Sequence, residues 1–359
     1  MKHLWKAVLF TTFGLTACGG GGSSTPPDSG NPPPPPAGSA LQTELSGTQT
    51  VELLQLDGAA QLAATTNGLL WRANSQATWQ TRSPITDPVT ALAIIEQGHY
   101  LLAFAGNDSS PARLFKTIDA GLTWQAVNHN FGGNQATPIR GLQYDALSDQ
   151  IYAIGTDALA VADRNAENWT LLAGQWDTFG TGLSLLRIDS IANVIWYGGQ
   201  GAIENGFLIR YDRATREIQR WDDLLPNPSV FKGGLVHPTD QGLMLFSGEG
   251  GIVRSDDYGA EWTQPLGDVN HRFYFDIVLA ESGILYSARY DKGSPTQELV
   301  VECSTDNGIT WHTNDFSDET SHGGVKSLLL VEDSSTTRLY LGLWDNGIKS
   351  VDISDLQCS

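Results

Sequence analysis

Three segments of the chain repeat one eight-residue pattern. In each, a hydroxyl residue is followed by Asp two positions later, by Gly two positions after that, and by Trp at the end of the segment. The copies read TIDAGLTW (117–124), SDDYGAEW (255–262) and STDNGITW (304–311). Internal repetition is typical of solenoids, propellers and other arrays, in which each repeat is one unit that packs against its neighbours. The repeat therefore constrains the architecture more than any other feature of the sequence.

The residue types of the repeat predict a tight turn between two strands. A Ser or Thr followed by Asp can bond nearby backbone N–H groups, Gly adopts positive φ without steric penalty, and Trp can bury a large surface between sheets. These structural roles are assigned to Asp119, Gly121, Trp124, Asp257, Gly259, Trp262, Asp306, Gly308 and Trp311. The alternative is that the three Asp residues bind a metal or act as acids and bases. We predict no metal site, because a catalytic group is needed once and this carboxylate recurs three times.

Weaker copies of the repeat fill the rest of the chain. The Trp residues that end the copies, at positions 79, 124, 169, 221, 262 and 311, are 41 to 52 residues apart. This is the length of a four-stranded propeller blade. Strand-like units recur seven times and helix-period segments of useful length are absent, but the seventh unit lacks one strand, which LQTELSG (41–47) can supply. The sequence predicts an all-β fold, a single seven-bladed β-propeller over residues 41–359 that an N-terminal strand closes.

The N-terminus carries a second strong signal. Lys2 and Lys6 precede an apolar stretch (7–15) that is too short to span a membrane, and LTAC (15–18) follows. The segment resembles a bacterial lipoprotein signal, which implies a signal peptide over residues 1–17 and lipidation of Cys18. The alternative is an ordinary signal peptide followed by a chance Cys. By the same resemblance, Gly19 in place of Asp implies an exported protein anchored in the outer membrane of a Gram-negative bacterium.

Residues 18–40 predict an unfolded tether. They are rich in Gly, Ser and Pro and include five consecutive prolines at 32–36, so they cannot bury enough apolar surface to fold. At about 3.1 Å per residue in extended proline conformation, the tether reaches on the order of 70 Å. The formal net charge of the whole chain is −19, which disfavours nucleic acid and anionic lipid as partners. We therefore expect contact with the membrane through the lipid anchor only, and no nucleic acid.

The remaining two cysteines predict a disulfide. With Cys18 assigned to lipid, Cys303 and Cys358 are left in a compartment that oxidises thiols. Cys303 comes immediately before a repeat turn, and Cys358 follows the third strand of the next unit, so both are expected at one rim of adjacent blades. Two free thiols remain the alternative, because a disulfide requires a close Cα separation that the sequence does not give.

The topology separates two faces of the predicted ring. The repeat turns join third to fourth strands on one face, whereas the loops from second to third strands and from blade to blade form the opposite face, here called the loop face. Exposed aromatic residues beside charged ones recognise sugars or peptides. The predicted binding residues on these loops are Trp176, His271, Arg272, Tyr290, His322 and Trp344. The alternative is that the aromatic residues only cover loop backbone.

The repeat is identified as an Asp-box, and the whole folded region resembles the Asp-box (BNR-type) propellers. This group includes sialidases, xyloglucan-cleaving glycosidases, sortilin-like receptors and the photosystem II assembly factor family. The resemblance implies architecture, because the Asp-boxes of sialidases lie away from the active site. A sialidase would need an arginine triad and a Phe-Arg-Ile-Pro motif near the first blade, whereas the nearest string here is TPIRGL (137–142). The xyloglucan enzymes typically use two propellers, and this chain has one.

Two functions remain. The first is a membrane-anchored, non-catalytic propeller lipoprotein, a monomer without cofactor, that binds a protein or glycan partner through its loop face. The alternative is a sialidase- or xyloglucanase-like glycoside hydrolase, which needs two carboxylates about 5 to 10 Å apart. The candidate carboxylates by loop position are Asp177, Glu204, Asp291, Asp318 and Asp345. No zinc ligand cluster, phosphate-binding glycine loop or nucleophile elbow is present in the sequence.

Overall fold

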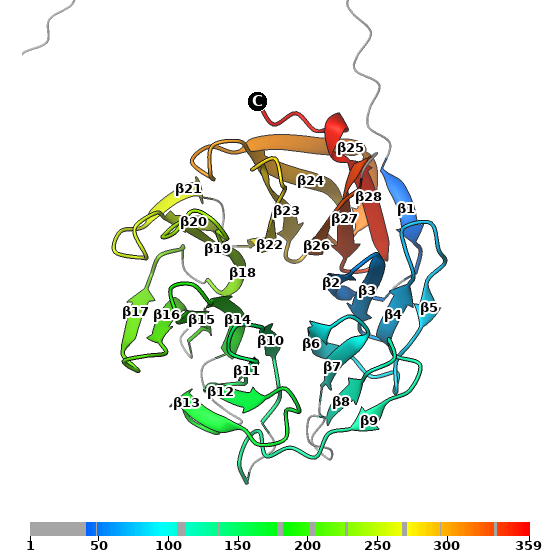
Figure 1. Ribbon diagram of the computed structural model, residues 1–359. Helices are drawn as coiled ribbons and strands as arrows, with labels where there is room; N and C mark the ends of the chain where they lie inside the picture. Colours follow the sequence, from blue (N-terminus) through cyan, green and yellow to red (C-terminus); the bar gives the residue numbers. More distant parts are fainter. Residues whose placement is uncertain are drawn as a thin grey trace, which may run out of the picture. The chain divides into compact units, whose positions relative to one another are not determined.

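The chain folds into a ring of seven antiparallel sheets with four strands each (Figure 1). The computed structural model describes residues 41–47, 49–105, 113–134, 137–177, 182–201, 205–226, 229–267, 271–294, 296–333 and 336–359, with the side chains of 317–322 left out. The prediction of a seven-bladed, all-β propeller is confirmed. The predicted signal peptide (1–17), Cys18 and the tether to residue 40 lie outside the described residues. Within the described part of the chain, no helix is long and apolar enough to cross a membrane.

Six blades use four consecutive strands, and the innermost strand comes first in each. Blade 1 consists of β2 (Val51–Asp57), β3 (Ala60–Thr65), β4 (Gly68–Arg72) and β5 (Gln80–Thr81). Blade 2 consists of β6 (Val89–Glu96), β7 (His99–Phe104), β8 (Arg113–Thr117) and β9 (Gln125–Ala126). Blade 3 consists of β10 (Gly141–Asp145), β11 (Gln150–Ile154), β12 (Ala158–Asp163) and β13 (Thr170–Gly174).

The later blades follow the same order. Blade 4 consists of β14 (Gly182–Asp189), β15 (Val194–Gln200), β16 (Gly206–Asp212) and β17 (Ile218–Asp222). Blade 5 consists of β18 (Phe231–Val236), β19 (Met244–Gly248), β20 (Gly251–Ser255) and β21 (Thr263–Gly267). Blade 6 consists of β22 (Arg272–Leu279), β23 (Leu285–Asp291), β24 (Thr296–Ser304) and β25 (His312–His322).

Blade 7 is completed by the first strand of the chain. It consists of β26 (Val325–Glu332), β27 (Thr337–Leu343), β28 (Ile348–Asp352) and, as its outer strand, β1 (Gln42–Leu45). β1 pairs with β28 in antiparallel register, with Gln42 opposite Ser350. Glu44 also forms an ion pair of 2.9 Å with Arg72 of blade 1, so one short strand links the last blade to the first. The predicted closure by residues 41–47 is confirmed.

The apolar core lies between neighbouring blades. Blades 4 and 5 share one cluster, in which the fully buried Trp196 of β15 contacts Phe246 of β19 at a centroid distance of 5.4 Å. Trp262, which follows β20, packs edge-on against Trp196 at 5.9 Å. Wide aromatic rings fill the gap between these two twisted sheets. Each blade therefore depends on its neighbours for its buried surface.

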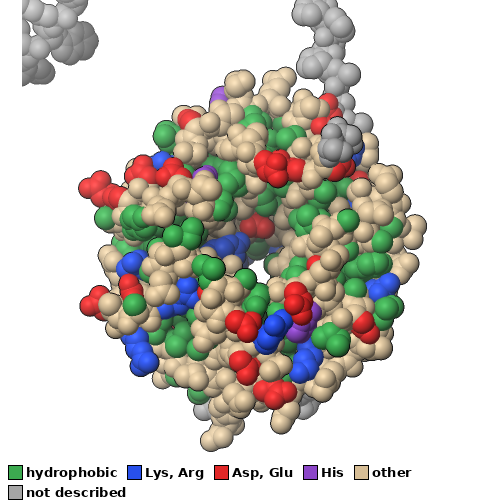
Figure 2. Space-filling model, viewed as in Figure 1, with side chains coloured by type: hydrophobic (Ala, Val, Ile, Leu, Met, Phe, Trp, Pro, Cys, Tyr) green, Lys and Arg blue, Asp and Glu red, His purple; other side chains and the backbone are tan. Residues whose placement is uncertain are grey.

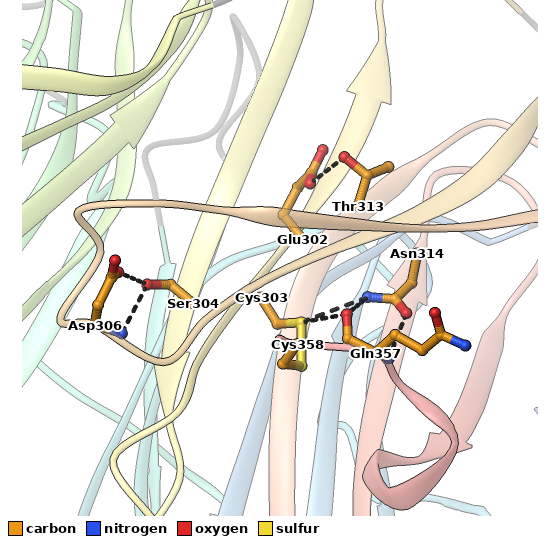
Figure 3. Close-up of a disulfide and its surroundings, with 8 residues drawn as sticks. All are labelled: Glu302, Cys303, Ser304, Asp306, Thr313, Asn314, Gln357 and Cys358. Carbon is orange, nitrogen blue, oxygen red and sulfur yellow. Dashed lines mark hydrogen bonds between the residues drawn. A yellow bond between two sulfur atoms is a disulfide. The ribbon is translucent and has the colours of Figure 1, made fainter.

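A disulfide fixes the end of the chain to blade 6. Cys303, the next-to-last residue of β24, bonds to Cys358, which follows the short 3-10 helix η1 (Ile353–Asp355), across a Cα–Cα distance of 5.4 Å. The amide groups of Asn314 in β25 bond the backbone of Gln357 twice, at 2.7 and 3.1 Å (Figure 3). The predicted pairing of Cys303 with Cys358 is confirmed.

We expect the variant Cys303→Ala/Cys358→Ala to lose about 4 kcal/mol of unfolding free energy, because a bond across 55 residues restricts the unfolded chain. Urea denaturation of the variant and the wild type measures this loss. Wild type with a reducing agent is the matched control, since reduction breaks the bond without changing side-chain volume. Equal midpoints for oxidised and reduced wild type would show that the disulfide contributes nothing.

Candidate functional site

The three repeat segments (117–124, 255–262 and 304–311) form the same turn. In the last one, the Ser304 hydroxyl donates to the Asp306 carboxylate at 2.8 Å and accepts from the Gly308 N–H at 2.9 Å (Figure 3 shows Ser304 and Asp306). The Asp306 carboxylate accepts from the Thr310 N–H at 2.9 Å. Equivalent bonds occur in the other two turns. All three glycines have left-handed φ, between 78° and 85°.

The carboxylates of these turns are held ionised by local bonds. The hydroxyl of Thr123, then its backbone N–H and the Thr117 hydroxyl, lower the pKa of Asp119 to about 2. Trp124 donates its indole N–H to the Arg82 carbonyl at 2.8 Å and thereby fastens the turn to blade 1. The geometry agrees with a structural role for the repeat residues. Within the described residues, no three His, Cys, Asp or Glu side chains gather in a way that would suit a metal ion.

Two predicted binding residues come together on the loop face of blades 6 and 7. Tyr290 of β23 stacks on Trp344, in the loop after β27, with centroids 5.3 Å apart and planes 25° apart. Trp344 is 43% exposed, whereas Tyr290 is only 9% exposed, so the expectation that Tyr290 faces solvent is wrong. It is buried because Phe273 and Phe275 of β22 pack against its ring. We call Phe273, Phe275, Tyr290 and Trp344 the aromatic patch.

The patch is preorganised by a cation and borders a hollow. The Lys326 ammonium lies 4.7 Å from the centroid of Trp344 and 5.1 Å from that of Phe275. The same ammonium pairs with Glu52 at 2.7 Å, which fixes its position. A hollow of about 260 Å³ opens beside the stacked rings of Tyr290 and Trp344. A fixed aromatic surface beside an open hollow suits the binding of a ring or an extended segment.

The other predicted binding residues do not join the patch as exposed anchors. Trp176 is half-buried against Phe131 at a centroid distance of 5.0 Å, because the loops before and after blade 3 cover each other there, so its expected exposure is also wrong. Arg272 pairs with Asp291 at 2.8 Å. His271 is exposed beside it, and His322 ends β25 with its side chain outside the described part.

The candidate carboxylates of the glycosidase alternative come from separate segments of the chain. Asp177 follows blade 3, and Asp345 lies in the loop after β27 of blade 7. Asp291 is the partner of Arg272. Glu204 and the side chain of Asp318 lie outside the described part of the chain.

A further set of polar side chains lines the central channel, and the sequence analysis missed it. Toward the loop face, the innermost strands enclose a hollow of about 270 Å³ with Arg140, Arg187, Lys232 and Lys326 in its wall. Figure 2 shows Lys and Arg side chains beside the opening at the centre of the ring. Burial, and then the nearby Lys326 and Arg140, lower the pKa of Lys232 to about 8. A signal was present: three of these cations directly follow the first apolar residue of their unit.

Comparisons with known proteins show the fold. Neither protein-family models nor curated protein sequences give a match. The GH74 xyloglucanase from Xanthomonas campestris is 15% identical, with a TM-score of 0.65 over 89% of this chain and 55% of its own. YCF48 bound to a D1 peptide is 15% identical, with a TM-score of 0.61 over 86% of this chain and 95% of its own. A chain of the mitotic checkpoint complex is 13% identical, with a TM-score of 0.64 over 92% of this chain and 99% of its own.

These likenesses define the fold class of the protein. It has the β-propeller fold that the GH74 and YCF48 structures also have. The chain spans about half the length of the GH74 enzymes that it resembles, 49% of an ancestral one and 55% of the xyloglucanase. Identities of 11 to 15% establish the fold and leave the function to the residues of this chain.

We expect Ser304→Ala to lower the unfolding free energy by about 1 to 3 kcal/mol, because the buried hydroxyl joins the two ends of the turn. Thr305→Ala, at the exposed neighbouring position, is the matched control and should change stability by less than about 0.5 kcal/mol. Thermal or urea unfolding of both variants measures the difference. If the two variants lose equal stability, the repeat hydroxyl does not hold the turn.

Proposed function

We propose that the protein is a non-catalytic binding module that holds a protein or glycan partner on its loop face, with the aromatic patch as the main anchor. The observation that carries this proposal is the exposed ring of Trp344, stacked on Tyr290 and held by Lys326. A rigid aromatic anchor loses little conformational freedom on binding, so most of its buried area contributes to affinity. The ion pair between Lys326 and Glu52 keeps that anchor in place before a partner arrives.

The solved structures offer support for a binding role. The YCF48 structure contains a bound D1 peptide, and another chain that is matched over nearly its whole length is part of the mitotic checkpoint complex. This chain spans 95% and 99% of those two proteins, against about half of the GH74 enzymes. The single ring has the size of the binding propellers. The ion pair between Arg272 and Asp291 also engages one of the five candidate carboxylates of the hydrolase alternative.

The binding surface is expected at the cell envelope. We propose that residues 1–17 direct export, that Cys18 carries the lipid anchor in the outer membrane and that residues 18–40 form the tether. The lipoprotein-like sequence of residues 1–18 supports this proposal, and the disulfide is compatible with an oxidising compartment. The tether would let one monomeric propeller reach partners on the order of 70 Å from the membrane surface.

Trp344→Ala should weaken partner binding at least about tenfold, because central aromatic anchors commonly contribute 2 kcal/mol or more. Tyr258→Ala is the matched control, since Tyr258 is 42% exposed and lies in a repeat turn on the opposite face. Binding is measured by titration against a defined polysaccharide panel and by quantitative capture from envelope extract. Equal losses in both variants would exclude the aromatic patch as the anchor.

The same polysaccharide panel tests the hydrolase alternative. A non-catalytic module binds without releasing sugar from any member. Release of reducing sugar by the wild type, abolished by Asp291→Asn or Asp345→Asn, would overturn the proposed function in favour of a glycosidase.

Cys18→Ser should move the protein from the membrane fraction to the soluble fraction. The several acyl chains of a processed lipoprotein anchor it firmly, and the variant has none. Fractionation followed by immunoblotting measures the distribution, with the propeller fold checked by its thermal transition. A variant that remains with the membrane would show that another feature anchors the chain.

A further inference from the structure

The inner strands share a local irregularity at the loop-face end of the channel. In six blades, the pairing between the first and second strands shifts by one residue next to the first buried position. In blade 5, for example, Phe231 and Gly233 pair with consecutive residues of β19, and Lys232 is left between them. At such a β-bulge, the extra side chain does not follow the regular alternation of side chains between the two faces of the sheet. In blade 3, Arg140 occupies the corresponding place just before β10.

The bulges place a ring of polar side chains around one hollow. The bulge positions supply three cations, Arg140, Lys232 and Lys326, and two hydroxyls, Thr90 and Ser184. Blade 1 supplies Glu52 at its bulge, and the wider bulge of blade 6 supplies Asp276. Every blade therefore contributes to the wall of the same hollow of about 270 Å³. We call this ring the channel collar.

The charges of the collar do not balance. Lys326 pairs with Glu52 at 2.7 Å, and Arg187, which also lines the hollow, pairs with Asp276 at 3.2 Å. Within the described part of the chain, Arg140 and Lys232 form no ion pair and no side-chain hydrogen bond. The mouth of the channel therefore carries two unpaired positive charges in a protein with a formal net charge of −19.

A second observation favours an anion in the hollow. The pKa of Lys232 is lowered to about 8 by burial, Lys326 and Arg140, so the neighbouring positive charges oppose its protonation. An oxyanion between Arg140 and Lys232 would offset both charges.

We propose that the channel collar binds a tetrahedral oxyanion, a sulfate or phosphate group carried by a small ligand, between Arg140 and Lys232. A guanidinium and an ammonium bind such groups through charge-assisted hydrogen bonds. The volume accommodates the anionic group with a few waters, whose share is about 30 Å³ each. The proposed anion ligands Arg140 and Lys232 lie outside the aromatic patch, whereas Lys326 and Phe275 border both the patch and the hollow.

The test uses the purified full-length protein and inorganic sulfate, inorganic phosphate and acetate as probes in titration calorimetry at constant ionic strength. We expect sulfate or phosphate to bind at least about tenfold more tightly than acetate. Arg140→Gln/Lys232→Gln should weaken that binding by at least about tenfold, because it removes both unpaired charges. Arg164→Gln/Arg216→Gln removes the same charge from turns after third strands, on the opposite face, and should leave the affinity unchanged.

The pH dependence of sulfate binding tests whether Lys232 contacts the anion, because a purely structural role of Lys232 would not produce it. Sulfate does not titrate between pH 7 and 9, whereas Lys232, with a pKa of about 8, loses its proton in this range. Lys326, Arg140, Glu52 and Glu249 are the charged groups that face Lys232. Sulfate binding should therefore weaken from pH 7 to pH 9 in the wild type. Lys232→Arg should keep its affinity at pH 9.

Each outcome of these titrations either supports the proposal or overturns it. Binding of phosphate alone assigns a phosphate ester, binding of sulfate alone assigns a sulfate ester, and binding of both supports the shared chemistry. No measurable binding of either at millimolar concentration, acetate binding as tight as theirs, or equal effects of the two double variants would overturn the proposal. If Arg140→Gln/Lys232→Gln does not fold, Arg140→Gln alone replaces it, because Arg140 is exposed to the channel. Trp344→Ala should keep sulfate binding, so loss of the proposed partner site remains distinguishable.

Discussion

Closure of the ring by β1 is the interaction on which the rest of the structure depends. Without it, β28 would present an open edge, and blades 7 and 1 would lose the contacts that join them. Arg72 makes this link specific, since it is buried between blades 1 and 7, pairs with Glu44 at 2.9 Å and lies 5.3 Å from the ring centroid of Tyr340. The C-terminus is restrained at the neighbouring blade by the disulfide. A closed ring fixes the angles between blades, and those angles set the width of the channel and the spacing of the loops.

Close packing of the backbone explains why the second strands of blades 4 and 5 carry glycine near their ends. A Cβ on Gly199 would lie 1.9 Å from the Gly182 carbonyl, and one on Gly248 would lie 1.8 Å from the Val230 carbonyl. These contacts occur at the loop-face ends of the second strands, where the first strand bulges toward its neighbour. The glycines of the second strands and the bulges of the first strands therefore belong to the same close packing of two backbones. Because the backbones approach so closely there, the bulge residue has no space inside the sheet and points into the channel.

Much of the fold could be predicted from the sequence, because the repeat acts locally. Ser304, Asp306 and Gly308 are close in the chain and define the turn by themselves, and the spacing of Trp residues then gives the blade length. The candidate site could be predicted less well, because the exposure of a side chain depends on residues from neighbouring blades. Tyr290 lies in a polar loop sequence but is buried by Phe273 and Phe275. Three collar cations directly follow an apolar residue near the start of their units, but this pattern does not give the pairing register on which the collar depends.

The negative charges on the outer surface and the positive charges of the channel collar influence a ligand over different distances. At physiological ionic strength the screening length is about 8 Å, so carboxylates on the outer surface have little effect on a ligand inside the channel. Lys232 and Arg140, by contrast, line the same small hollow, where screening by mobile ions is weak. The outer charge keeps the protein soluble and repels anionic surfaces in general. A ligand gains from the collar only when its anionic group is small enough to enter the mouth of the channel, so the shape of the ring, more than its net charge, selects what binds there.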